Sequence, residues 1–322
     1  MRKHASENEG RGSPSSAALD TLKVSIARWA KNEGANPTAI PGLTAVRYDA
    51  PTKPRQAMYE PCVCVSAQGA KRVLLGGESF TYAPGNFLIS SVSLPTTVQI
   101  ARASREKPFL GCVLRLDARE ISQLMVDGSL PPPRAQRADR GMACGTLTPP
   151  LLSALQRLID LLAEPKDLPI LAPVLRREIT YRLLVGDQGA RLRQVALAGS
   201  RGHQISQAIE WLNAQYAQPL RVEDLAERVH MSPSAFHHHF RALTAMSPLQ
   251  YQKWLRLSEA RRLMLAEDLN AGTAALRVGY ESPSQFSREY RRLFERPPLQ
   301  DVAELRRSHD GAAPVMRRPT AL

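Results

Sequence analysis

The sequence predicts an α+β protein in which a β-rich N-terminal part precedes an entirely helical C-terminal part. Residues 43–116 contain short apolar runs bounded by turn residues, which is typical of strands in a small barrel or sandwich. From Pro149 onward the apolar residues recur with a helical period, and the last third carries two copies of one helix-turn-helix pattern. At 322 residues the chain is long enough for two domains, each with its own core.

The strands of the β-rich part are predicted from alternation and turn chemistry. The run CVCVSA alternates in the way a strand does, and RVLLGGESFTY reads as two strands joined by a hairpin turn at Gly76-Gly77. Further short strands are predicted, in order, in PGNFLISS, TTVQIAR and FLGCVLRLD.

A proline-containing loop separates these strands from the first long helices. Residues 127–141 carry three consecutive prolines and few apolar residues. The next helix has one apolar stripe, and a second helix in LAPVLRREITYRLLVG ends at Gly186. Either the first stripe is ordinary core or it forms part of a dimer interface. The stripe consists of Leu151, Leu152, Leu155, Leu158, Ile159 and Leu162.

Composition places the protein in the cytoplasm but does not by itself identify a partner. No apolar run approaches the roughly 18 residues of a membrane helix, and the polar N-terminus reads as neither a signal peptide nor an anchor. The formal net charge is +13, yet the excess is spread along the chain, so charge alone is weak evidence for nucleic acid. Four cysteines without a C-x2-C pair fit a reducing compartment and argue against a zinc ribbon.

The internal repeat is the most informative feature of the chain. SPSAFHHHFRAL at 232–243 aligns with SPSQFSREYRRL at 282–293 at an offset of 50. Upstream, Ala226 and Val229 match Ala275 and Val278 at an offset of 49, so one residue is inserted in the second turn. An insertion in the turn between matched helices is what a duplicated helix-turn-helix predicts.

Each copy predicts a short helix with a sharp start and one buried face. Ser-Pro at the start supplies a capping hydroxyl and a residue with no N–H to lose, and Ser282 with Gln285 fits a capping box. Aromatic and Leu side chains at i, i+4 and i+7 predict the buried face. The residues opposite that face are Ser234, His238 and Arg241 in the first copy, and Ser284, Arg288 and Arg291 in the second.

The exposed residues suit the DNA major groove. Arg reads guanine there, and the other donors contact phosphates. Between the two copies, residues 247–265 predict an unbroken helix of roughly 27 Å, which would set two recognition helices about one DNA turn apart. The chain would then read two successive groove segments without a palindromic dimer.

Residues 205–300 resemble the DNA-binding domain of the AraC/XylS family of bacterial transcription regulators. The resemblance is carried by LAERVHMSPSAFHHHFRALTAMSPLQYQKWLRLSEARRLML and AALRVGYESPSQFSREYRRLFERPP. It implies base contacts by Ser234, His237 and His238 in the first unit and by Ser284, Ser287 and Arg288 in the second. The family commonly has Arg where this chain has His238. The run from Tyr59 to Pro95 is similar to the cupin-like regulatory region of one AraC-type subfamily, which implies a small β-barrel for sensing or dimerisation.

We therefore expect a sequence-specific transcription regulator, more an activator than a repressor, and not an enzyme. Its expected partners are double-stranded promoter DNA and RNA polymerase, with a small-molecule effector and a second copy of the chain as further candidates, and with no membrane partner and no cofactor. The predicted organisation is a disordered tail at 1–20, the cupin-like β-rich domain at 21–126, a linker and helical segment at 127–200, the double helix-turn-helix domain at 205–305 and a tail at 306–322.

Other functions are less well supported by the sequence. Consecutive residues on a helix point about 100° apart, so His237, His238 and His239 cannot converge on one metal ion. A metal-dependent cupin enzyme needs histidines on its strands, and there is none between Tyr48 and Leu116. The alternative to a DNA-directed function is a cupin-like small-molecule or redox sensor in which DNA binding is secondary. Cys62 and Cys64 would share one side of a strand, and we expect buried, inert thiols rather than a sensor.

Overall fold

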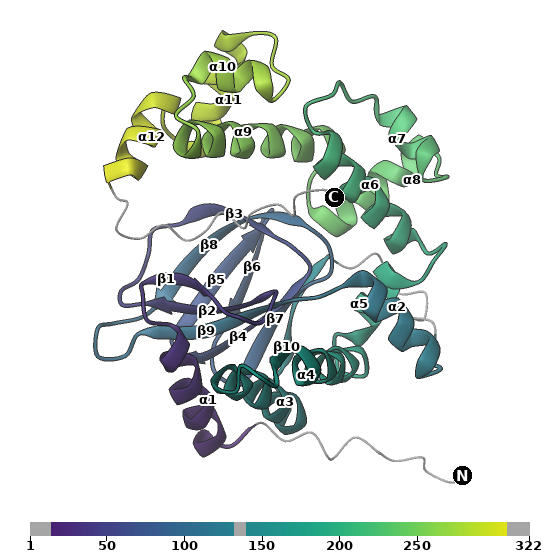
Figure 1. Ribbon diagram of the computed structural model, residues 1–322. Helices are drawn as coiled ribbons and strands as arrows, with labels where there is room; N and C mark the ends of the chain where they lie inside the picture. Colours follow the sequence, from purple (N-terminus) through teal and green to yellow (C-terminus); the bar gives the residue numbers. More distant parts are fainter. Residues whose placement is uncertain (1–13, 132–139, 308–322) are drawn as a thin grey trace.

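Two antiparallel β-sheets pack against each other, and a helical domain covers one end of them (Figure 1). The computed structural model describes residues 14–131 and 140–307. The larger sheet has the order β1-β2-β9-β4-β7-β10 and the smaller has the order β3-β8-β5-β6. The strands are β1 (Gly34–Pro37), β2 (Leu43–Tyr48), β3 (Arg55–Tyr59), β4 (Cys62–Gln68), β5 (Ala70–Leu75), β6 (Glu78–Tyr82), β7 (Asn86–Ser90), β8 (Leu94–Arg102), β9 (Phe109–Arg115) and β10 (Met142–Thr146).

The α+β class is confirmed, but the predicted barrel is not closed. A barrel needs every strand paired on both sides, and here each sheet ends in edge strands that pair with no strand of the other sheet among the described residues. The two sheets instead pack face to face, and their inner side chains share one apolar core. The hairpin predicted at Gly76-Gly77 forms between β5 and β6.

Alternation along β4 divides its side chains between two cores. Cys62 and Cys64 face the smaller sheet and belong to the core between the sheets. Val63 and Val65 point the other way and pack in the core beneath the helices. Both faces of this strand are therefore buried, which explains the apolar run from Cys62 to Val65 at its start.

Helices cover the outer face of the larger sheet. The predicted stripe between Leu151 and Leu162 is buried in the core under this sheet, so its interpretation as ordinary core is confirmed. The helices in this layer and beside it are α1 (Ser16–Trp29), α2 (Ala118–Asp127), α3 (Pro149–Asp160), the 3-10 turn η1 (Leu161–Ala163), α4 (Leu168–Leu184) and α5 (Gly189–Ala196).

The observed element boundaries differ from the predicted ones at two places. The first helix begins at Ser16, inside the predicted tail, because the Ser15 hydroxyl caps it and Leu22 is buried. Residues 142–146, which were assigned to the linker segment, form β10 and pair with β7 along their whole length. Residues 1–13, most of the predicted loop at 127–141 and residues 308–322 lie outside the described part of the chain.

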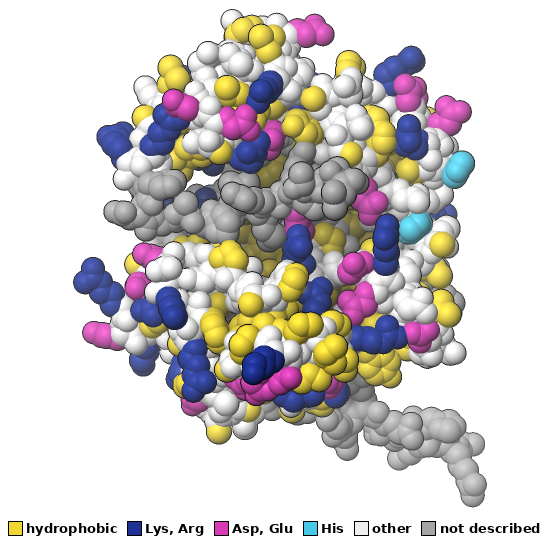
Figure 2. Space-filling model, in the orientation of Figure 1, with side chains coloured by type: hydrophobic (Ala, Val, Ile, Leu, Met, Phe, Trp, Pro, Cys, Tyr) yellow, Lys and Arg dark blue, Asp and Glu magenta, His cyan; other side chains and the backbone are white. Residues whose placement is uncertain are grey.

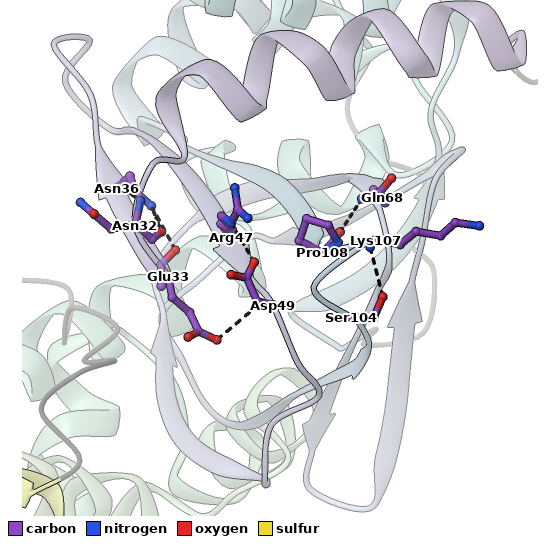
Figure 3. Close-up of polar contacts among 10 residues, drawn as sticks. Asn32, Glu33, Asn36, Arg47, Asp49, Gln68, Ser104, Lys107 and Pro108 are labelled. Atoms are coloured by element: carbon purple, nitrogen blue, oxygen red, sulfur yellow. Dashed lines mark hydrogen bonds and ion pairs between the residues drawn. The ribbon is translucent and has the colours of Figure 1, made fainter.

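Polar contacts hold the ends of the larger sheet (Figure 3). The Asn36 amide donates to the carbonyl of Asn32 at 2.8 Å, and the Arg47 guanidinium donates to Asp49 at 2.8 Å. Across the sheet, the Gln68 amide donates to the Pro108 carbonyl at 2.8 Å. The bonds to the Asn32 and Pro108 carbonyls satisfy backbone groups near strand ends, where the sheet ladder no longer does so.

The helical domain contains two helix-turn-helix units joined by one long helix. Within the described ranges, no helix combines the length and apolar character needed to cross a membrane. The helices of the domain are α6 (Arg201–Gln215), α7 (Val222–Arg228), α8 (Pro233–Thr244), α9 (Pro248–Ala266), α10 (Ala271–Arg277), α11 (Pro283–Phe294) and α12 (Pro298–Arg307).

The turn of the second unit approaches the first unit so closely that it requires glycine. Gly279 has φ +87°, and a Cβ there would lie 2.1 Å from the carbonyl oxygen of Ala217. We expect Gly279→Ala to destabilise the protein by more than the roughly 1–2 kcal/mol that the left-handed conformation alone costs, because the Ala217 backbone must also move. Urea unfolding followed by circular dichroism measures this change.

Gly272 provides the matched control, because it lies inside α10 and a Cβ there would meet only Asn270 Oδ1 at 3.4 Å. We expect Gly272→Ala to leave stability unchanged or to raise it by up to about 1 kcal/mol. Equal unfolding midpoints for the two variants would show that the close approach at Gly279 does not exist in solution.

Candidate nucleic-acid interface

The two predicted helix-turn-helix units fold alike. The first consists of α7 and α8, and the second of α10 and α11. The hydroxyls of Ser232 and Ser282 accept hydrogen bonds from the backbone N–H groups three residues later, at 3.4 Å and 3.2 Å. Both recognition helices end in a left-handed residue, Ala245 with φ 61° and Glu295 with φ 62°, again 50 residues apart. The repeat in the sequence is therefore a repeat in the structure.

One predicted cap forms only in part. Ser282 accepts from the Gln285 N–H, but the Gln285 side chain donates to Glu289 at 3.4 Å instead of returning to the cap. The complete capping box is found at α9, where Ser247 and Gln250 bond reciprocally. Glu289 lies one turn after Gln285 on the same helix, so its carboxylate is within reach of the Gln285 side-chain amide and accepts the hydrogen bond that would otherwise complete the box.

The buried and exposed faces of both recognition helices follow the predicted pattern. Phe236 and Phe240 in α8 are fully buried, as are Phe286 and Tyr290 in α11. The eight residues predicted to contact DNA are all exposed to solvent, four on each helix: Ser234, His237, His238, Arg241, Ser284, Ser287, Arg288 and Arg291.

The three consecutive histidines lie in different environments. His237 and His238 are exposed, whereas His239 is half-buried. Burial lowers the pKa of His239, and the nearby charges of Arg201 and His238 lower it further. The His238 and His239 rings meet edge to face with centroids 5.1 Å apart. In the described ranges, no three or more His, Cys, Asp or Glu side chains form a group that could hold a metal ion.

Arginines of the helical domain fall into two groups. Arg256, Arg261 and Arg262 are tied to carbonyl or carboxylate oxygens within the domain. In contrast, neither Arg288 nor Arg291 makes an ion pair with any described residue. A surface guanidinium without an internal partner can bind a phosphate or a base without breaking an existing bond.

The structure adds Arg292 to the exposed face of α11. It lies one turn after Arg288 and is exposed, so the two guanidinium groups project from neighbouring positions. The repeat comparison did not suggest it, because the corresponding residue of the first unit is Ala242. The sequence did contain a signal for this position, because Arg292 follows Arg288 by four residues and therefore lies on the same face of a helix.

The long helix α9 takes part in two separate cores. Its first half contributes Tyr251, Trp254 and Leu255 to the core that also contains the first unit. Its second half contributes Leu257 and Leu263 to the core of the second unit. Because α9 has no break, its 19 residues form a rigid connection of roughly 27 Å between the two units.

Arg256, at the middle of α9, joins the two units directly. Its guanidinium donates to the carbonyls of Tyr216 at 2.7 Å and Gln218 at 2.9 Å, in the segment between α6 and α7 that leads into the first unit. It also donates to the carbonyl of Gly279 at 2.9 Å, in the turn of the second unit. The relative orientation of the two units is therefore set by hydrogen bonds as well as by the helix.

The β-sheets contact the first unit and α9, which the sequence analysis did not predict. The Tyr251 hydroxyl donates to the Ser93 carbonyl at 2.9 Å, and the Trp254 indole donates to the Gln56 side chain at 3.3 Å. Arg140 donates to Glu78 at 2.7 Å and to the Ala242 carbonyl at 2.8 Å. The signal available in the sequence was the pair of aromatic residues three apart in the otherwise polar start of α9.

Positive charge is not concentrated in one patch on the face shown in Figure 2, where Lys and Arg side chains are scattered over both the sheet layer and the helical domain. This agrees with the even distribution of basic residues along the sequence. The case for nucleic acid therefore rests on the paired recognition helices rather than on bulk charge.

The cysteines lie where the alternation of β4 predicted. Cys62 and Cys64 are buried on the same side of the strand, with their sulfur atoms 3.8 Å apart. The shared hydrogen bond lowers the pKa of Cys64 and raises that of Cys62, and the charge of Lys71 lowers both. Burial raises the pKa of Cys112 to about 12. Cys112 faces the helix-covered side of the sheet.

Two family models match the chain in sequence order. Residues 39–191 match the N-terminus of AraC-type transcriptional regulators, and residues 225–303 match a helix-turn-helix domain. The first model extends over β10 and the helices after it, which agrees with their packing on the larger sheet.

Curated relatives are bacterial transcription regulators. The chain is 28% identical over 162 residues to the regulator CdhR of Pseudomonas aeruginosa, covering 50% of this chain and 48% of that protein. It is 28% identical over 155 residues to the activator RhaS of Citrobacter koseri, covering 45% and 53%. The chain thus spans about half the length of the curated relatives it matches.

A solved structure shares the overall fold. ToxT of Vibrio cholerae, bound to (E)-4-(8-methylnaphthalen-1-yl)but-3-enoic acid, superposes with a TM-score of 0.54 at 10% identity, covering 82% of this chain and 98% of that chain. At this identity the likeness shows the fold alone. The two family models, which together span most of the chain, and the curated relatives show that the chain belongs to the AraC/XylS family of transcription regulators.

Proposed function

We propose that the protein binds promoter DNA sequence-specifically and regulates transcription there. Its two recognition helices would enter two successive segments of one major groove. The observation that carries this proposal is the matched pair of exposed faces on α8 and α11, held at a fixed spacing by one unbroken helix. We place its action in the cytoplasm, as a regulator rather than an enzyme.

The chemistry of the exposed side chains suggests which of them contact bases and which contact phosphates. Arg288 lies at the middle of α11 and is suited to bidentate contact with guanine O6 and N7. Arg241, Arg291 and Arg292 lie further along their helices and are suited to phosphate contacts, which fix register without reading sequence. The shorter side chains of Ser234, His237, Ser284 and Ser287 can donate to bases or phosphates that come close.

The second unit should contribute more affinity than the first. His238 occupies the position of Arg288, and a neutral imidazole offers fewer donors and a shorter reach than a guanidinium. The departure from the common Arg of the family therefore concerns one base contact and not the fold of the unit, because His238 is fully outside the core.

We further propose that the β-domain modulates DNA binding through its contacts with the first unit. Arg140 bonds to the end of α8, and the Ser93 carbonyl accepts a hydrogen bond from the start of α9. A change of conformation within the sheets can therefore alter the orientation of the first recognition helix. ToxT structures contain bound small molecules, including an unsaturated fatty acid, which supports a small-molecule effector here. Activation through RNA polymerase and action as a homodimer belong to the same proposal.

We expect Arg288→Ala to weaken binding to the cognate promoter site by about 1–3 kcal/mol and to relax base choice at one position. Fluorescence anisotropy with a library of single-base variants of the site measures both effects. Arg119→Ala is the matched control, because it removes one exposed positive charge from α2, on the other domain. An equal loss on cognate and random DNA would mean that Arg288 contacts only phosphate.

We expect His238→Arg to maintain or tighten promoter binding, since it restores the larger donor at an exposed position. His239→Arg is the control: that position is half-buried beside Arg201, where a permanent cation is disfavoured, so no gain is expected. Measured dissociation constants for both variants at one salt concentration distinguish the two positions. A collapse of affinity in His238→Arg would show that the imidazole makes a specific contact that Arg cannot replace.

A further inference from the structure

The interior between the two sheets contains a group of polar side chains that the DNA-binding function does not use. Cys62 and Cys64 of β4 are 0% and 1% exposed and face this interior, with their sulfurs in contact at 3.8 Å. Tyr59 of β3 and Tyr82 of β6 face the same interior and are almost fully buried. We call these four residues together with Lys71 the dithiol cluster.

Lys71 is a cation directed toward this interior. It alternates with Val73 and Leu75 on β5, which are fully buried in the core between the sheets, so all three side chains share one face of the strand. Its ammonium lies 5.4 Å from the centre of the Tyr59 ring. It makes no ion pair with any residue in the described ranges. Lys71 is half-buried, and with no carboxylate beside it the cluster lacks a negative group that would balance this charge.

The Tyr59 hydroxyl is a second unsatisfied group. It is buried and makes no hydrogen bond of normal geometry within the described ranges, although the Tyr82 hydroxyl and the Cys64 thiol lie close enough to interact with it. Buried hydroxyls are normally satisfied, so an unpaired one beside two sulfurs and a lysine indicates a site whose ligand completes the polar contacts.

We infer that the dithiol cluster binds one soft monovalent metal ion of the Cu(I) class between Cys62 Sγ and Cys64 Sγ. Thiolate sulfur selects such ions over hard cations. Two thiols bind the ion with release of two protons, and the resulting bis-thiolate complex carries one negative charge. Lys71 supplies the matching positive charge, and the Tyr59 hydroxyl can donate to a sulfur atom.

The geometry disfavours other ligands. Structural zinc takes four ligands, whereas the described residues offer no third metal-binding side chain at this point. Cys112 points to the opposite face of the sheet. Cys144 shares the face but is two strands away, since both it and Cys64 pair with Leu88, which separates them by about 10 Å.

The cluster lies in the same continuous core as the first helix-turn-helix unit. This core runs from Cys62 and Cys64 to Tyr251 and Trp254 of α9. Tyr59 pairs with Leu94, which follows the carbonyl that Tyr251 binds. Ion binding that shifts β3 or β4 would therefore reach the start of α9. This second step rests on the proposed function, whereas the metal site does not.

The site is tested by titrating the reduced, full-length protein with Cu(I) against a chromophoric Cu(I) chelator. We expect one ion per chain. Cys62→Ser and Cys64→Ser should each weaken binding by at least 100-fold, and Cys144→Ser should leave it unchanged. Lys71→Met should weaken binding by about 10–100-fold, the range for a residue that supports metal ligands, and Lys71→Arg should restore it. Equal affinity in the Cys62→Ser/Cys64→Ser protein and the unchanged chain would overturn the assignment.

X-ray absorption of the Cu(I)-loaded, unsubstituted protein tests the site without relying on any variant that fails to fold. We expect two sulfur neighbours; three or more neighbours, or nitrogen neighbours, would overturn the site.

Promoter binding with and without Cu(I) then tests the coupling. A change of about fivefold or more is expected, and it should be absent in Cys64→Ser. If Cu(I) binds but promoter affinity does not change, the coupling is wrong and the site stands. If the metal-free protein does not bind promoter DNA at all, the proposed function fails separately.

Discussion

The Arg256 guanidinium is the interaction on which the geometry of the helical domain depends. It donates to carbonyls after α6 and to the carbonyl of Gly279, so one side chain joins both helix-turn-helix units at the middle of α9. Lys could not replace it, because an ammonium cannot reach carbonyls on both sides in the plane of a fork. Because these hydrogen bonds join the two units, the orientation of α8 relative to α11 is held fixed, and the two recognition helices do not move independently.

The helical domain could be predicted from the sequence almost in full, because its signals are local. Ser-Pro starts, aromatic residues at i and i+4, and an offset of 50 are properties of short segments, and the exposed faces of α8 and α11 follow from them. The strands β4 to β9 were also predictable, from alternation and turn residues, whereas β1, β2, β3 and β10 were not assigned as individual strands. What alternation cannot show is whether a sheet closes, since closure depends on which edge strands pair over long sequence distances, and here none of the described ones do.

The contacts between the domains could not be predicted from the sequence, because they too join residues that are far apart in the chain. Ser93, Arg140 and Tyr251 are far apart in the chain, and no pattern within one segment shows which residues of another segment they contact. The dithiol cluster shows the same limit. The spacing of Cys62 and Cys64 predicted a shared face, but only the packing of β3 and β5 across from β4 brings Tyr59 and Lys71 to that face. The base contacts of the recognition helices remain predictions, because neither the sequence nor the structure tests them.

The position of β10 late in the chain determines where the protein can be cut into stable fragments. Residues 142–146 follow the proline-containing segment, yet they complete the larger sheet by covering β7. A shortened protein ending at residue 126 would leave β7 as a bare edge with unpaired N–H and C=O groups, which is a template for intermolecular pairing. A soluble fragment of the β-domain should therefore extend past α5, and a fragment beginning near residue 201 would isolate the helical domain at the cost of exposing Tyr251 and Trp254.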